Sequence, residues 1–146
     1  MCADPHGSPW RWAAREMLIG PRGVVKASAL WLPLSLVLAA TEAPGAAGRC
    51  LALFVAVACW TQVCILGNDL ADRADDLAAG KRRWIQTLPP WGGVGIVAAL
   101  AAAGLAAGVA AGAPGLALAT YVAGLVVGLL YSLAPVRLKD RGALGP

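Results

Sequence analysis

The sequence predicts an all-α protein, a polytopic transmembrane bundle with four spanning helices. Of its 146 residues, 59% are hydrophobic and only 14% are charged, whereas a soluble domain carries about a quarter charged residues. The apolar residues stand in long uninterrupted blocks instead of recurring at the spacing of an amphipathic helix. The basic residues are distributed between these blocks in a way that fits four membrane crossings.

Three apolar blocks supply the four predicted spans. Residues 27–41 form the shortest block, with Lys26 placed to snorkel at its edge. Residues 50–67 form the second, without a charge. Residues 91–135 form the third, which is divided by Gly-Ala-Pro-Gly at 112–115 into halves of about twenty residues, the length that crosses the hydrocarbon core of a bilayer. A cleaved signal peptide is the alternative for the first block, although its preceding charged region is long for one.

The lysine and arginine residues predict the orientation of the bundle. Eleven of the 12 basic residues fall on one side of a four-span arrangement, and only Arg49 falls on the other. Because basic residues accumulate on the cytoplasmic side, the chain is predicted to lie in the cell (inner) membrane with both termini cytoplasmic. Residues 1–22 would be a cytoplasmic tail and residues 23–146 a transmembrane domain that contains a cytoplasmic Asp-rich loop over 68–90.

The composition argues against several classes of function. The single histidine, His6, argues against a His-based metal site or a Ser-His triad, and the four cysteines form no CxxC pair. The net charge of +4 reflects topology, since no basic patch with interleaved aromatic residues suggests nucleic-acid binding.

Glycines recur at four-residue spacing in the last two predicted spans. Gly104, Gly108 and Gly112 form one stripe, and Gly124 and Gly128 form another. Such spacing lets helix backbones approach closely inside a membrane, although a composition rich in small residues also produces it by chance. The stripes predict helix contacts and no chemistry.

The segment GNDLADRADDLAAGKRRW, residues 67–84, contains half of the eight acidic residues. No helix-breaking residue precedes Gly80, so the second span is predicted to leave the membrane as a continuous helix. On that helix Asn68 and the four aspartates fall within an arc of roughly 120°. Like charges three and four positions apart repel one another, so this arrangement predicts a cationic partner.

Magnesium is the cation that this oxygen-rich face suits best. Mg²⁺ prefers hard oxygen ligands and commonly bridges one or two carboxylates to a substrate phosphate. Lys81, Arg82 and Arg83 follow closely and are predicted to hold the remaining phosphate oxygens. The spacing does not fit an EF-hand calcium loop. An ordinary solvated loop between spans is the alternative interpretation.

Two motifs resemble those of the UbiA-type intramembrane prenyltransferases. Asn68, Asp69, Asp72 and Asp76 match N-D-x-x-D-x-x-x-D, the first Asp-rich motif of that family, and Arg73 also fits its usual wording. The segment YSLAPVRLKDRGALG, residues 131–145, is similar to the family's Y-S-x-P-P-x-R-L-K-x-R, with Ala134 in place of the first proline.

The resemblance implies a fold of about nine helices around a cavity that opens toward the cytoplasm. It implies Mg²⁺-dependent transfer of a prenyl group from a prenyl diphosphate to an aromatic or lipid acceptor. Asp69, Asp72 and Asp76 would be catalytic and, with Asn68, would be ligands of the metal. The substrate-binding set would comprise Asn68, Arg73, Lys81, Arg82, Arg83, Tyr131, Arg137 and Lys139.

The resemblance covers only the N-terminal half of the family's fold. After Asp76 the remaining acidic residue is Asp140, so the second Asp-rich motif of the family has no counterpart. The chain is therefore expected to act with a second half-protein, as part of a longer product, or as a catalytically inert membrane subunit that retains the diphosphate half-site. A CDP-alcohol phosphotransferase is a weaker alternative, because its D-G-x-x-A-R wording is missing.

Overall fold

The computed structural model describes Arg11, residues 45–133 and residues 135–138. Within these residues the chain is helical, without strands. The elements are α4 (Ala46–Ala71), α5 (Arg73–Ala78), the 3₁₀ helix η1 (Trp84–Thr87), α6 (Pro90–Ala110) and α7 (Gly115–Ser132). The predicted first span at 27–41, with Lys26, and the predicted substrate-binding residue Lys139 lie outside the described residues.

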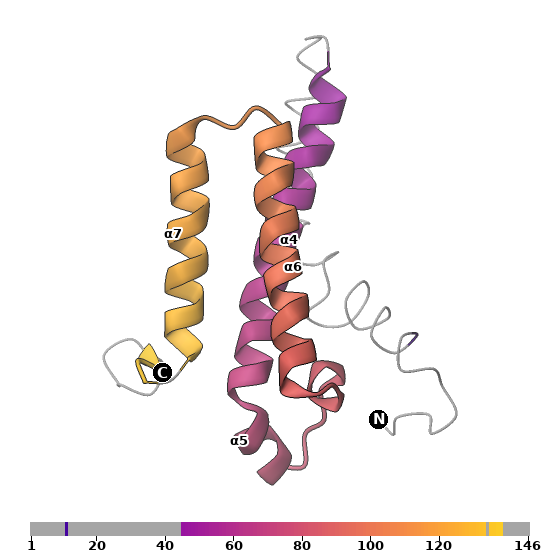
Figure 1. Ribbon diagram of the computed structural model, residues 1–146, viewed down its shortest axis with the longest axis vertical. Helices are drawn as coiled ribbons and strands as arrows, with labels where there is room; N and C mark the ends of the chain where they lie inside the picture. Colours follow the sequence, from indigo (N-terminus) through magenta and orange to yellow (C-terminus); the bar gives the residue numbers. More distant parts are fainter. Residues whose placement is uncertain (1–10, 12–44, 134, 139–146) are drawn as a thin grey trace.

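Three helices, α4, α6 and α7, are long and apolar enough to cross a membrane. They correspond to the predicted spans two, three and four, and they give the chain the architecture of an integral, all-helical membrane protein. Helix α4 packs extensively along α6 and less extensively against α7. The Asp-rich end of α4 and the C-terminal end of α7 lie at the same end of the bundle (Figure 1).

Two glycines end helices where the sequence predicted breaks. Gly80 follows α5 with φ 70°, and the amides of Gly80 and Lys81 donate to the carbonyls of Leu77 and Asp76. Gly112 follows α6 with φ 71° in the same arrangement, a Schellman motif that satisfies the last carbonyls of a helix. Glycine adopts this left-handed conformation without steric cost. The turn at Gly112 divides the long apolar block into α6 and α7.

The helix that leaves the membrane is interrupted, contrary to the prediction of a continuous helix to Gly80. Asp72 adopts φ −90° and ψ 10°, which ends α4, and α5 begins at the next residue. The amide of Asp72 still donates to the carbonyl of Asn68, so the break changes the helix direction and leaves few backbone groups unpaired.

The segment after α5 folds back against the bundle. Trp84 and Ile85 of η1 form a buried cluster with Leu66 of α4. Trp84 is therefore a core residue, whereas Trp91 at the start of α6 is exposed. The predicted Asp-rich loop over 68–90 is thus a packed structure that comprises the end of α4, α5 and η1.

The glycine stripes form helix contacts, with one exception. A Cβ atom added at Gly104 would meet the Tyr121 hydroxyl of α7 and the Cys59 Cβ of α4, and one at Gly108 would meet Leu118 of α7. On α7, Gly124 faces Trp60 and Gly128 faces Cys64 of α4. Gly112 does not belong to this contact surface, because it forms the turn after α6.

Replacing Gly104 by alanine is expected to destabilise the bundle. The new methyl group overlaps the Tyr121 hydroxyl and lies 2.8 Å from the Cys59 Cβ, which is too close for either to remain in place. Overpacking of this kind costs about 1–3 kcal/mol. Thermal unfolding in detergent measures the effect. In the control, Gly95→Ala on the same helix, the methyl group meets no atom within 4 Å, and the higher helix propensity of alanine leaves stability unchanged or raised. Equal unfolding temperatures for the two variants would contradict the packing.

Candidate functional site

The three motif aspartates are enclosed at one end of the bundle. The Asp69 side chain is 9% exposed, that of Asp76 13% and that of Asp72 20%, whereas that of Asp75 is 69% exposed. The difference follows the motif: the three residues at its spacing point into the structure, and the aspartate outside its spacing points toward solvent. A carboxylate that is withdrawn from water must be compensated by hydrogen bonds or by a cation.

Arg83 compensates two of these carboxylates. Its Nε lies 3.8 Å from Asp69 Oδ1 and 3.6 Å from Asp76 Oδ2. The residue enters the site because η1 folds back across the end of α4. Lys81 Nζ also approaches Asp76 Oδ1, at 4.0 Å, but the lysine is largely exposed, and pairs of that kind contribute little.

Arg137 compensates the third carboxylate from the opposite side. Its Nη2 donates to Asp72 Oδ1 at 3.3 Å and to Asp75 Oδ2 at 3.1 Å, which links the segment after α7 to the end of α4. The Arg137 backbone has φ 32°, a left-handed conformation that costs a non-glycine residue about 1–2 kcal/mol. The surrounding contacts hold the arginine in this strained position beside the two aspartates.

A polar contact between spans lies next to these ion pairs. The Ser132 hydroxyl at the end of α7 donates to the Asn68 Oδ1 at 2.9 Å. Both residues come from segments that are 64 positions apart in the chain, so this bond sets the position of α7 relative to the motif. Ser132 is buried.

Gln86 was missed by the sequence analysis. This buried residue of η1 donates from Nε2 to the Asp69 carbonyl at 2.9 Å and to Asp76 Oδ2 at 3.1 Å. Its Oε1 accepts from the Arg83 amide at 3.3 Å. One side chain thus ties the first and last aspartates of the motif to the arginine that pairs with both. Nothing in the local sequence distinguishes this glutamine from a surface residue, because its role arises from the fold-back of η1.

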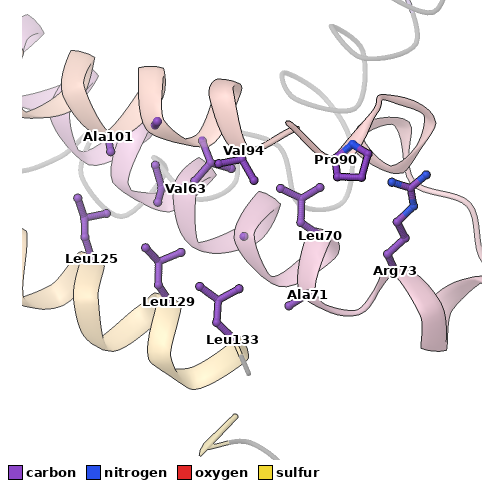
Figure 2. Close-up of a pocket in the computed structure, with 13 residues that line it drawn as sticks. Val63, Leu70, Ala71, Arg73, Pro90, Val94, Ala101, Leu125, Leu129 and Leu133 are labelled. Carbon is purple, nitrogen blue, oxygen red and sulfur yellow. The ribbon is translucent and has the colours of Figure 1, made fainter. Parts of the chain in front are cut away.

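Two separate spaces flank the contact between α4 and α7. The Asn68 groove, about 540 Å³, is lined by Cys64, Ile65 and Asn68 of α4 and by Gly128, Tyr131 and Ser132 of α7. The three-helix cavity, about 480 Å³, lies between α4, α6 and α7 and is lined by residues such as Val63, Gly67 and Leu125 (Figure 2).

The Asn68 groove lies on the aspartate side of α4, and the three-helix cavity lies on the far side. At 3.6 residues per turn, Asn68, Asp69 and Asp72 centre on a direction roughly opposite to that of Val63, Gly67 and Leu70. The predicted cavity-lining residue Tyr131 lines the groove. Arg73 lines the three-helix cavity, so the structure does not bring it together with the carboxylates. Arg82 is exposed.

The carboxylates offer the oxygen donors that magnesium prefers, but they are engaged with arginines. In the described part of the chain, no three histidine, cysteine or acidic residues come together as a group that could hold a metal ion. The donor chemistry therefore fits Mg²⁺, while the arrangement does not form a ready-made metal cage. A divalent ion would have to bind together with an anion that draws Arg83 and Arg137 away from the aspartates.

Fold and site together define an integral membrane protein whose helical bundle carries an enclosed, arginine-neutralised aspartate cluster at one end. Comparisons with protein-family models, with curated proteins and with solved structures find no match to this chain.

Proposed function

We propose that this chain binds a prenyl diphosphate together with Mg²⁺ at the aspartate cluster and serves prenyl transfer of the UbiA type. The observation that carries the proposal is the enclosure of Asp69, Asp72 and Asp76 between two arginines, beside a groove in an apolar bundle. Carboxylates for a metal, guanidinium groups for phosphate oxygens and apolar walls for a hydrocarbon chain are the three elements that such a ligand requires.

An exchange of ion-pair partners would allow the buried charges of the aspartate cluster to be compensated both with and without the ligand. In the described arrangement, each of the three enclosed carboxylates pairs with Arg83 or Arg137, and the two arginines offset two of the three negative charges. A magnesium diphosphate presents a cation to the aspartates and anionic oxygens to the arginines. Each buried charge then changes partner without losing compensation, which avoids the cost of an unpaired buried charge.

The residues of the proposed site have distinct roles. Bound Mg²⁺ would neutralise the charge that develops on the departing diphosphate. The metal ion would be held by Asp69, Asp72 and Asp76, together with the amide oxygen of Asn68. Arg83 and Arg137 would bind phosphate oxygens through their planar forks, and Lys81, which is exposed beside Asp76, would add a third cation.

The Asn68 groove is the proposed place for the prenyl chain. It opens on the aspartate side of α4, and apolar side chains such as Ile65 and Val127 line it. Tyr131 and Ser132 would lie near the diphosphate end, where Ser132 keeps Asn68 oriented. The acceptor is an aromatic or lipid molecule that reaches the same end from the membrane or the cytoplasm, and a second half-protein would complete the walls.

Binding of a non-hydrolysable prenyl thiodiphosphate tests the proposal. The full chain in lipid nanodiscs is expected to bind farnesyl thiodiphosphate with Mg²⁺ and to lose most of that affinity in EDTA. Inorganic diphosphate is expected to compete weakly, because it cannot use the groove. Binding that does not respond to Mg²⁺ removal would refute the site.

A catalytically inert subunit is the second candidate, and a specific observation favours it. The described residues provide one aspartate cluster and no group of three acidic residues that could hold a metal by themselves. Transfer from a radiolabelled prenyl diphosphate to a panel of acceptors separates the candidates. Mg²⁺-dependent binding without any transfer product identifies the subunit, and product formation identifies the enzyme.

A further inference from the structure

The walls of the three-helix cavity are apolar except for one charged residue. Of the thirteen residues that line it, twelve are apolar or lack a polar side chain, and the thirteenth is Arg73. Figure 2 shows Arg73 and Pro90 at one end of the cavity and Ala101 and Leu125 toward the other. The cavity therefore presents a long hydrocarbon surface that ends at a guanidinium group.

Arg73 differs from Arg83 and Arg137, the two arginines that pair with the aspartate cluster. Its neighbour Asp72 and the nearby Asp76 pair with Arg137 and Arg83, respectively, and among the described residues Arg73 forms no ion pair. Its Nη1 donates to the Leu88 carbonyl at 3.4 Å, a long hydrogen bond that leaves most of its donors available. A half-buried guanidinium beside an acidic segment, yet turned away from it, favours an anion from outside the chain.

We propose that the three-helix cavity binds one acyl chain of an anionic phospholipid, whose phosphate contacts Arg73. Between membrane-spanning helices, hydrocarbon is the medium that fills an apolar space, and it leaves no polar group unpaired. Arginine binds phosphate oxygens through a planar fork, and anionic headgroups lie at the level where a basic residue ends a span. The lipid would fill the space between α7 and the pair α4 and α6 and would hold the three helices together.

This site is separate from the proposed substrate site and does not rest on it. The residues of α4 that line the cavity, such as Val63, Gly67 and Leu70, face away from Asn68 and Asp69. A ligand in the three-helix cavity therefore leaves the Asn68 groove free. The two sites can be tested with different ligands and with different variants.

Photocrosslinking measures the proposed lipid contact. The full chain is reconstituted in nanodiscs with a phosphatidylglycerol that carries a photoactivatable acyl chain, or with the matching phosphatidylcholine, and the labelled peptides are mapped by mass spectrometry. Phosphatidylglycerol is expected to label α6 around Ala98 and Ala101 and α7 around Leu129. Arg73→Gln is expected to lower that labelling roughly fivefold, while Arg82→Gln, which removes an exposed arginine nearby, leaves it unchanged.

A second pair of variants tests the acyl chain independently of charge. Ala101→Phe fills the cavity and is expected to lower labelling by both lipids, whereas Ala102→Phe, which points away from the cavity, is not. Equal labelling of wild type and Arg73→Gln overturns the proposal, as does label confined to other peptides. Displacement of the label by farnesyl thiodiphosphate with Mg²⁺ also overturns it, since the cavity would then hold the prenyl chain. Ala101→Phe retains Mg²⁺-dependent diphosphate binding if the two sites are separate.

Discussion

Replacing Asp72 by alanine is expected to weaken the Mg²⁺-dependent binding of a prenyl diphosphate analogue strongly. Asp72 is enclosed and is held by Arg137, so its loss removes a proposed metal ligand and one partner of the arginine. Loss of one charge-assisted contact corresponds to about 1.5–3 kcal/mol, or roughly 10- to 100-fold in affinity. Titration of the nanodisc-embedded chain with fluorescent farnesyl thiodiphosphate, with and without Mg²⁺, measures the change.

Asp75 supplies a closely matched control for this substitution. It carries the same charge, lies three positions away and pairs with the same Nη2 atom of Arg137, but its side chain is 69% exposed and falls outside the motif. Asp75→Ala is therefore expected to change the affinity by less than about threefold, within the range of an exposed pair. If both variants lose affinity equally, the binding depends on the total negative charge of the segment and not on the enclosed site.

Replacing Gln86 by leucine is expected to weaken the site without touching its charges. The substitution removes the donor for the Asp69 carbonyl and for Asp76 Oδ2, and it removes the acceptor of the Arg83 amide. Buried groups left without partners cost about 1–3 kcal/mol. Both the unfolding temperature and the affinity for Mg²⁺ with farnesyl thiodiphosphate are therefore expected to fall.

Gln62 separates the positioning role of Gln86 from the effect of removing any buried glutamine. Gln62 is also buried in the bundle, but its Nε2 has no hydrogen-bond partner in the described part of the structure. Gln62→Leu is therefore expected to leave stability unchanged or to raise it, and to leave diphosphate affinity unchanged.

A conservative Gln86→Glu variant is expected to retain the shape but to repel Asp76, so its affinity should recover as the pH falls and the new carboxyl group is protonated. Affinity that is independent of pH in this variant would argue against the contact with Asp76.

Much of the helical framework could be predicted from local sequence. Uninterrupted apolar blocks long enough to cross a bilayer predicted the spans that became α4, α6 and α7. Glycine at positions 80 and 112 predicted the ends of α5 and α6, because a left-handed residue terminates a helix wherever it occurs. These properties depend on residues within one or two turns of each other, so they can be predicted without knowledge of the fold.

The arrangement of the site could be predicted only in part. The spacing of Asp69, Asp72 and Asp76 indicated a shared face, but the break at Asp72 and the fold-back of η1 were not visible in it. The roles of Gln86 and Arg83 follow from that fold-back. Arg73, which the motif placed with the aspartates, instead lines the three-helix cavity. It lies beyond the break at Asp72, in α5, so its direction does not follow from the periodicity of α4.

The sequence by itself determined that this is a helical membrane protein with an acidic segment at the end of a span, because hydropathy and charge are properties of each residue. Only the tertiary structure decided which arginine neutralises which aspartate and on which side of α4 each cavity lies. Those choices depend on how α7 and η1 are rotated and docked against α4, and they join residues as much as 65 positions apart. Pairing over such separations is set by the packing of whole helices.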